Sequence, residues 1–225
     1  MTTREYAIQC IKDEAEALLE LIPQIDEQFD KAVEMIYQCK GKVIVTGVGK
    51  SGHIGAKMAA TFSSTGTPSF FINPLDVYHG DLGVMTKDDV VVAISNSGQT
   101  DELLRFIPMV LHMQIPIIGM SGNPQSLLAK YSTCHININV RKEACPLNLA
   151  PTSSTTATLA MGDALAVALI EKRNGFGTPQ GIHRDALGHH RPQGGIRCGG
   201  RHPRRRPQAG ACCRRSSVGQ HPHSG

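Results

Sequence analysis

The residues best suited to chemistry form a hydroxyl-rich segment at positions 95–100, with the sequence Ser-Asn-Ser-Gly-Gln-Thr. An apolar run at residues 90–94 precedes it and predicts a buried parallel strand. Apolar residues at helical spacing follow it over residues 101–112. Free N–H groups at a helix N-terminus, together with three hydroxyls, make a site for a phosphate dianion. The same residues would also serve as an ordinary helix cap, so the segment alone leaves both interpretations open.

A glycine-rich segment at residues 47–52 is a second candidate site. It follows an apolar run at residues 42–46 that predicts a strand, and residues 53–62 are typical of a helix. Its glycine spacing matches neither a Walker A loop nor G-x-G-x-x-G, so it is weak evidence for a nucleotide. Small residues still admit an anion to the backbone, and Lys50 beside Ser51 adds a positive charge. A solvated lysine in a turn is the alternative interpretation.

A loop at residues 74–83 carries the third candidate group. It contains Asp76, His79 and Asp81. A histidine beside carboxylates can bind a sugar hydroxyl or a metal ion. It can equally lie on the surface without a function, and the loop alone does not decide between these interpretations.

The segment at residues 141–156 is too long and too specific to be a plain connection. It contains Glu143 and ends in a Ser/Thr run. That run predicts the cap of a helix over about residues 155–172, with Ser153 or Ser154 as the N-cap. Capping alone would explain the hydroxyls, whereas Glu143 ahead of the helix is less easily explained in this way.

A regular alternation of strands and helices must position these groups. Strands are predicted at residues 42–46, 69–73, 90–94, 115–120 and 133–138, and helices at residues 53–62, 101–112, 125–130 and 155–172. This alternation predicts an α/β fold with a parallel sheet and helices on both faces. Ligands bind such sheets beyond the carboxyl ends of the strands. The polar segments after the first four strands all fall at that edge, which is stronger evidence than any one segment.

The N-terminal segment, residues 1–40, reads as helical and is interrupted near Pro23. Its two apolar stripes must be buried on the core or on another subunit, which makes an oligomer a reasonable expectation. In the last helix we expect a buried face formed by Leu159, Ala160, Ala164, Leu165 and Ala168.

The composition of the chain favours a cytoplasmic protein with no membrane association. No apolar run is long enough to span a bilayer, and residues 1–5 do not open a signal peptide. The seven cysteines include no C-x-x-C pair, so neither a zinc site nor a disulfide framework is expected.

Residues 175–225 differ in character from the rest of the chain. They hold nine of the 23 basic residues, all of them Arg, but one acidic residue, Asp185. Without aliphatic periodicity this tail is expected to be disordered. An Arg-rich arm could bind nucleic acid, with salt-sensitive affinity that deletion of the tail would remove. Arg without Lys and scattered Cys are more typical of GC-rich DNA translated in a shifted frame, so nucleic acid is not expected as a partner.

Several motifs together resemble the sugar isomerase (SIS) domain of D-arabinose 5-phosphate isomerases. They are Gly-Lys-Ser-Gly-His-Ile-Gly at 49–55, Ser-Thr-Gly-Thr-Pro at 64–68, His-Gly-Asp-Leu-Gly at 79–83, Ser-Asn-Ser-Gly at 95–98, and Glu-Ala-Cys-Pro at 143–146 with Ala-Pro-Thr-Ser-Ser-Thr at 150–155. The resemblance covers about residues 5–174. It implies a three-layer αβα sandwich with a five-stranded, flavodoxin-like parallel sheet over residues 41–174, and a homotetramer. The implied reaction interconverts D-ribulose 5-phosphate and D-arabinose 5-phosphate, the first step toward the sugar Kdo of lipopolysaccharide or capsule, with no cofactor.

The resemblance also implies roles for individual residues. The catalytic residues would be Lys50, Glu102 and Glu143, and the substrate-binding residues Gly66, Thr67, His79, Ser95, Ser97, Thr100 and Ser51. Either glutamate could be the base that moves a proton between C1 and C2. Asn73 stands where some members have a histidine that could bind zinc, so no metal is expected.

The chain departs from the family pattern after its last helix. A fourth catalytic residue of the family, a histidine in a His-Pro-Gly-Gly motif, is absent from this sequence. Two functions therefore remain open. The retained Lys50, Glu102 and Glu143 favour an isomerase, whereas the missing histidine favours a sugar-phosphate-binding module without turnover.

Overall fold

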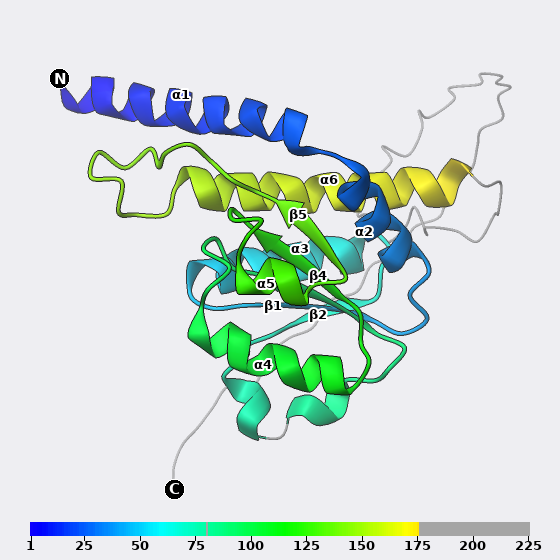
Figure 1. Cartoon of the computed structure of the whole chain (residues 1–225). Helices are drawn as coiled ribbons and strands as arrows, with labels where there is room; N and C mark the ends of the chain where they lie inside the picture. Colours follow the sequence, from blue (N-terminus) through cyan, green and yellow to red (C-terminus); the bar gives the residue numbers. More distant parts are fainter. Residues whose placement is uncertain (80, 176–225) are drawn as a thin grey trace, which may run out of the picture. The chain divides into compact units, whose positions relative to one another are not determined.

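Five parallel strands form a sheet at the centre of the described residues, which are 1–79 and 81–175 of this computed structural model (Figure 1). The strands are β1 (Val43–Gly47), β2 (Ser69–Ile72), β3 (Val90–Ile94), β4 (Ile117–Ser121) and β5 (Cys134–Asn137), in the spatial order β2-β1-β3-β4-β5. All residues of β1, β3 and β4 are buried, as their continuous apolar runs require. The predicted five-stranded parallel sheet is confirmed, with boundaries shifted by one or two residues. Of the predicted tail, residues 175–225, only Gly175 is described, as the end of the last helix, and the rest lies outside the described residues.

Helices cover both faces of this sheet, as predicted (Figure 1). They are α1 (Thr3–Leu21), α2 (Glu27–Tyr37), α3 (Lys50–Ser64), α4 (Asp101–His112), α5 (Leu127–Tyr131) and α6 (Ser153–Gly175), with 3-10 turns η1 (Ile22–Gln24), η2 (Asp76–His79) and η3 (Asp81–Val84). One apolar core joins α2, α3 and α6 to the sheet. A second core joins α4, α5 and η2 to the opposite face. The three-layer αβα arrangement is therefore confirmed.

The N-terminal helices bury their apolar residues unequally. Helix α2 places Ala32, Val33 and Ile36 in the core. Helix α1 packs along α6 (Figure 1), yet Ile8 and Ile11 on its length are 53% and 71% exposed. The predicted burial of both stripes is thus confirmed within one chain for α2 and only in part for α1.

The helix after β1 begins at Lys50, three residues earlier than predicted. Gly49 precedes it with a φ of 58°, a left-handed conformation that glycine adopts without strain. This turn brings the chain directly from β1 into α3. Lys50 is consequently the first residue of a helix and not part of a free glycine loop.

The last helix differs from the prediction in its start and in its buried face. It begins at Ser153, so neither Ser153 nor Ser154 is the cap, and Thr152 precedes it. Residues 157, 161, 165 and 169 are buried, whereas Leu159, Ala160, Ala164 and Ala168 are half-buried. The face is rotated because α6 packs against α1 on one side and α3 on another.

By length and composition, α6 could cross a membrane, whereas the sequence predicts no membrane-spanning segment. Its residues Ser153–Asn174 have a mean hydropathy of 1.3. Half of this apolar stretch of the helix is buried inside the fold, as expected for a core helix. Among the described residues this is the one such helix, and it is weak evidence for a membrane span.

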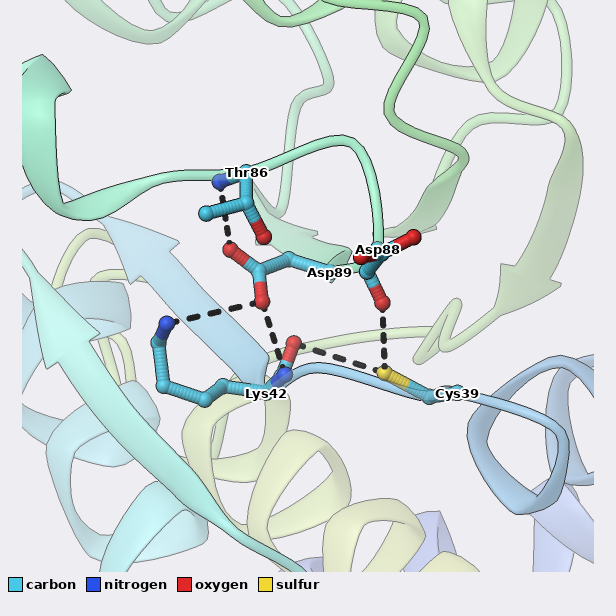
Figure 2. Close-up of polar contacts among 5 residues, drawn as sticks. All are labelled: Cys39, Lys42, Thr86, Asp88 and Asp89. Atoms are coloured by element: carbon cyan, nitrogen blue, oxygen red, sulfur yellow. Dashed lines mark hydrogen bonds and ion pairs between the residues drawn. The ribbon is translucent and has the colours of Figure 1, made fainter.

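A buried carboxylate joins the starting ends of β1 and β3 (Figure 2). The Asp89 side chain is fully buried and accepts hydrogen bonds from the backbone N–H groups of Lys42 and Thr86, both at 2.7 Å. The Lys42 ammonium lies 3.6 Å from the same carboxylate. The Cys39 thiol donates to the carbonyl of Asp88 nearby. These bonds fix the two strands beside each other at one edge, so that the loops at their other ends also adjoin.

Asp89→Ala should lower the free energy of unfolding by about 3 kcal/mol. The substitution leaves the backbone N–H groups of Lys42 and Thr86 without their charged, buried acceptor, and each such bond contributes about 1.5–3 kcal/mol. Urea unfolding monitored by circular dichroism measures the change. Asp88→Ala is the matched control, because Asp88 is exposed and contributes its backbone carbonyl. Equal stability of the two variants would contradict this role of Asp89.

Candidate active site

The loops that follow β1 and β3 meet at one edge of the sheet. These two strands are direct neighbours, with Gly47 paired to Ile94 at their carboxyl ends. The chain turns to opposite sides of the sheet after them, since α3 belongs to one core and α4 to the other. Such a switch point is where open α/β sheets bind ligands.

The segment at residues 95–100, here called the hydroxyl loop, is held by its own side chains. The buried Ser95 hydroxyl lies 2.8 Å from the Thr100 hydroxyl and accepts a hydrogen bond from the Gly98 N–H at 3.0 Å. The Ser97 hydroxyl accepts from the Gln99 N–H at 3.1 Å. Gly98 has a φ of 63°, which a side chain would strain. The backbone of the loop is therefore preorganised before any ligand arrives.

The alternative interpretation, an ordinary hydroxyl cap on α4, does not describe this loop. Thr100 occupies the N-cap position, but its hydroxyl bonds to Ser95 and makes no capping hydrogen bond. Gly49 at the N-cap of α3 has no side chain to offer either. Two helices of 12 and 15 residues thus begin here with N–H groups that no side-chain cap satisfies. Both helix dipoles favour an anion at this edge.

A cleft of about 360 Å³ opens between the hydroxyl loop, α3 and α6. Four of the residues predicted from the sequence line it: Lys50, Ser51, Ser97 and Thr100. Ser95 is 2% exposed and supports the loop from beneath. The structure therefore brings the predicted lysine and the predicted hydroxyls to one cavity, although they lie on separate loops.

Lys50 adds a positive charge to an edge that is already electropositive. Its side chain is exposed, and among the described side chains no carboxylate pairs with its ammonium. A cation at a helix N-terminus opposes the helix dipole. The position is unfavourable for stability and suited to a site that receives a negatively charged ligand.

Glu143 holds the N-terminus of α6. One carboxylate oxygen, Oε2, accepts hydrogen bonds from the Thr152 N–H at 2.7 Å, the Thr152 hydroxyl at 3.0 Å and the Ser154 N–H at 3.2 Å. Partial burial of the carboxyl opposes ionisation, but hydrogen bonds from Ser154 and Thr152 outweigh it and lower the pKa of Glu143. The carboxylate stays charged at neutral pH. Glu143 itself is not among the residues that line the cleft, but Ser154, which donates to it, is.

The Glu143 anchor should make the stability of the protein depend on pH in acid. Because the pKa is lowered in the folded state, the stabilisation is complete above the ordinary glutamate pKa of about 4.3. It is lost as the pH falls through the lowered folded-state value. Urea unfolding of the wild type and of Glu143→Gln from pH 7 to pH 3 should show a difference that shrinks below about pH 4.3. A difference independent of pH would contradict the assignment.

Glu102 lies in the first turn of α4, two residues beyond Thr100 of the cleft. Its side chain is half-buried. The helix places it next to the hydroxyl loop but outside the residues that line the cleft. The two predicted glutamates thus stand in different settings, one bonded to a helix N-terminus and one at the start of another helix.

Two predicted substrate contacts, Gly66 and Thr67, do not line this cleft within one chain. Gly66 and Thr67 follow the C-terminal end of α3, and a 15-residue helix separates them from Lys50 by about 22 Å. His79 ends η2, and its side chain lies outside the described part of the structure. Their roles stay predictions.

The contribution of α6 to the site is not predicted from the sequence. Ser154, Thr155 and Thr158 line the cleft, and so does Asn96 of the hydroxyl loop. The Ser/Thr run is visible in the sequence, where it predicts a helix cap. The spacing of positions 154, 155 and 158 places all three on one helix face, which was the available signal.

Comparisons with known proteins agree with this geometry. The SIS domain family model matches residues 35–168. Arabinose 5-phosphate isomerase KdsD of Francisella tularensis is 56% identical over 171 residues, which are 75% of this chain and 52% of that protein. KdsD of Escherichia coli K12 is 57% identical over 160 residues, which are 71% of this chain and 49% of that protein. The chain spans about half the length of these curated relatives.

A solved structure extends the likeness to three dimensions. The c3406 protein of Escherichia coli CFT073, solved in complex with arabinose 5-phosphate, has a TM-score of 0.74 and 41% identity to this chain. The match covers 77% of this chain and 94% of that protein. The family model, the sheet order and this solved relative agree, and the chain belongs to the SIS domain family.

Proposed function

We propose that the chain is an aldose–ketose isomerase that interconverts D-ribulose 5-phosphate and D-arabinose 5-phosphate. The observation that carries this proposal is the cleft shared by Lys50 and the hydroxyl loop. Its relatives support the substrate, since they are named arabinose 5-phosphate isomerases. The solved relative supports it as well, because it holds arabinose 5-phosphate. The name KdsD also implies a place in Kdo biosynthesis.

In the proposed mechanism the hydroxyl loop and the free starts of α3 and α4 hold the phosphate. This fixes the sugar so that C1 and C2 face the catalytic groups. A carboxylate, Glu102 or Glu143, removes the proton next to the carbonyl. Negative charge then builds on the oxygen of the enediol intermediate, and the ammonium of Lys50 stabilises it. Return of the proton to the neighbouring carbon, together with transfer of the hydroxyl proton from one enediol oxygen to the other, completes the isomerisation.

The test is to incubate the purified full chain with D-ribulose 5-phosphate and to measure D-arabinose 5-phosphate by NMR. Formation of the aldose, and of the ketose when the assay starts from the aldose, supports the isomerase. Reaction in deuterium oxide should place deuterium on C1 or C2, because the base exchanges its proton with solvent. A different aldose product or no product would refute this function.

The missing His-Pro-Gly-Gly motif is the observation behind a second candidate, a sugar-phosphate-binding module without turnover, which the names of the relatives do not favour. It predicts saturable binding of D-arabinose 5-phosphate by calorimetry with no product in the NMR assay. The two measurements together separate the candidates, because binding is common to both and turnover is not.

The proposal includes a homotetramer. Helix α1 exposes apolar residues along its length, and a neighbouring copy would bury them; they are Tyr6, Ile8, Ile11 and Leu19. A neighbour would also be the source of Gly66 and Thr67 if these contact the substrate. Light scattering of the purified chain should give about four times the 24.2 kDa of one copy. A monomer would contradict this part of the proposal.

The proposal also includes a cytoplasmic location. The described cysteines Cys10, Cys39, Cys134 and Cys145 are free thiols. Free thiols are typical of a reducing compartment. The proposed substrates are charged and do not cross membranes unaided, so an enzyme that acts on them would work where they are made.

A further inference from the structure

We propose that His135 is a positioning residue that fixes the hydroxyl loop through Ser121. The inference rests on the proposed function of that loop as the phosphate site. His135 is not among the residues that line the cleft. Any effect it has on the ligand must therefore pass through other residues, and the structure records a continuous set of contacts that can carry it.

The first contact joins His135 on β5 to the end of β4. The neighbours of His135 on its strand, Cys134 and Ile136, belong to the core on the α6 side of the sheet. The imidazole therefore lies on the opposite side, where its Nε2 is 2.8 Å from the Ser121 hydroxyl. Ser121 is the last residue of β4 and is fully buried.

The second contact joins Ser121 to the underside of the hydroxyl loop. Its hydroxyl lies 3.2 Å from the hydroxyl of Ser126, which is also fully buried. A methyl group at Gly98 would come within 2.2 Å of the Ser126 hydroxyl and 3.1 Å of the Ser121 hydroxyl. The two hydroxyls thus pack directly against the Gly98 backbone, and their position limits the position of the loop.

Backbone hydrogen bonds hold the loop on both sides of Ser97. The Gly122 N–H donates to the Asn96 carbonyl at 2.9 Å, and the Leu128 N–H donates to the Gly98 carbonyl at 3.1 Å. Both donors belong to the segment that Ser121 starts. Ser97, between the two acceptors, lines the cleft. Movement of Ser121 would therefore shift the part of the loop that meets the phosphate.

The imidazole is suited to this task because it is both a donor and an acceptor. Burial lowers the pKa of His135, and the negative charge of Asp26 opposes this effect without cancelling it. A neutral imidazole has one nitrogen that donates and one that accepts. The Ser121 hydroxyl can take either complementary role, so its hydrogen bond to Nε2 can form in either tautomer. A leucine at this position would fill similar space and leave the buried hydroxyl without this partner.

The experiment compares full-length His135→Leu and His135→Gln with the wild type by two readouts. Hydrogen exchange of peptides covering residues 95–100 reports the order of the loop. Calorimetry with D-arabinose 5-phosphate reports the ligand site. For the leucine variant we expect about fivefold faster exchange and about fivefold weaker binding, the size of one lost hydrogen bond. The glutamine variant should return both values toward wild type, because its amide can bond to Ser121.

Two further variants keep the result decisive. His112→Leu is the matched control, since His112 is exposed and lies at the far end of α4, about 16 Å of helix from the loop. If His135→Leu does not fold, Ser121→Ala removes the same contact together with those to Ser126 and Asn123, and should give changes in the same direction that are at least as large. Where the protein turns over its substrate, KM should rise in the leucine variant while kcat stays within about twofold.

The outcomes separate this inference from the proposed function. A folded His135→Leu or Ser121→Ala variant with wild-type exchange and wild-type affinity would overturn the positioning role, even if its melting temperature falls. Faster exchange in residues 95–100 together with a wild type that binds no sugar phosphate would support the positioning role. The failure of the wild type to bind a sugar phosphate would refute the proposed function of the loop and not the positioning role.

Discussion

Lys50→Met should lower the turnover of D-ribulose 5-phosphate by roughly 10²–10³-fold while the protein remains folded. In the proposed mechanism the ammonium faces charge that develops only in the transition state, so its loss falls on kcat. Lys50 is exposed and begins α3, where its charge opposes the helix dipole. Removing that charge should therefore leave the melting temperature unchanged or slightly raised. Steady-state kinetics and thermal unfolding measure the two effects.

Lys57→Met is the matched control for this variant. Lys57 lies on the same helix two turns later and pairs with Asp163 of α6, away from the cleft. Its replacement should leave kcat within about twofold, because a surface ion pair contributes little. A Lys50→Met enzyme with near-normal kcat would remove Lys50 from the mechanism. A loss of activity that follows a loss of folded protein would contradict the expectation that Lys50 acts in catalysis and not in folding.

Glu102→Gln and Glu143→Gln should each lower turnover by roughly 10²–10⁴-fold, the range of a lost general base or acid. The two carboxylates differ in setting. Hydrogen bonds from Thr152 and Ser154 stabilise the ionised form of Glu143 and lower its pKa, which weakens this carboxylate as a base. We therefore expect the deuterium exchange at the substrate carbon to stop in Glu102→Gln. In Glu143→Gln the exchange should be slowed, because the N-terminus of α6 shifts beside the cleft.

Asp101→Asn controls for the charge change at the start of α4. Asp101 is exposed and directly precedes Glu102 in the same helix turn. Both substitutions remove one negative charge from the first turn of α4. Because Asp101 has no assigned role in proton transfer, its replacement should leave turnover within about twofold. Near-normal rates in both glutamate variants would end the assignment of the acid–base groups. An equal loss in Asp101→Asn would indicate that helix charge, and not proton transfer, is responsible.

These variants also test whether residues that lie far apart within one chain act on the same substrate. If Lys50 and Glu102 prove essential, the remaining question is how Thr67 could reach the same substrate across about 22 Å of helix. If neighbouring copies complete each site, mixing inactive Lys50→Met chains with inactive Thr67 variants should restore activity. Activity that never returns on mixing would argue against such a shared site.

The sequence by itself determined most of the fold and part of the site. Alternating apolar runs and helical stripes predicted the parallel sheet, because strand and helix periodicity are local properties of the chain. The hydroxyl loop was found for the same reason, since it lies between one strand and the helix that follows. Local patterns were less reliable at boundaries, where the conformation of Gly49 moved the start of α3 to Lys50.

Only the tertiary structure decided which distant groups share the cleft. Ser154 and Thr155 come to the hydroxyl loop from more than fifty positions later, because α6 packs between α1 and α3. The same packing gave Glu143 its three hydrogen bonds at a helix N-terminus, which no spacing in the sequence encodes. Such contacts depend on the summed burial of many side chains across the core, whereas a sequence pattern reports the preferences of one segment at a time.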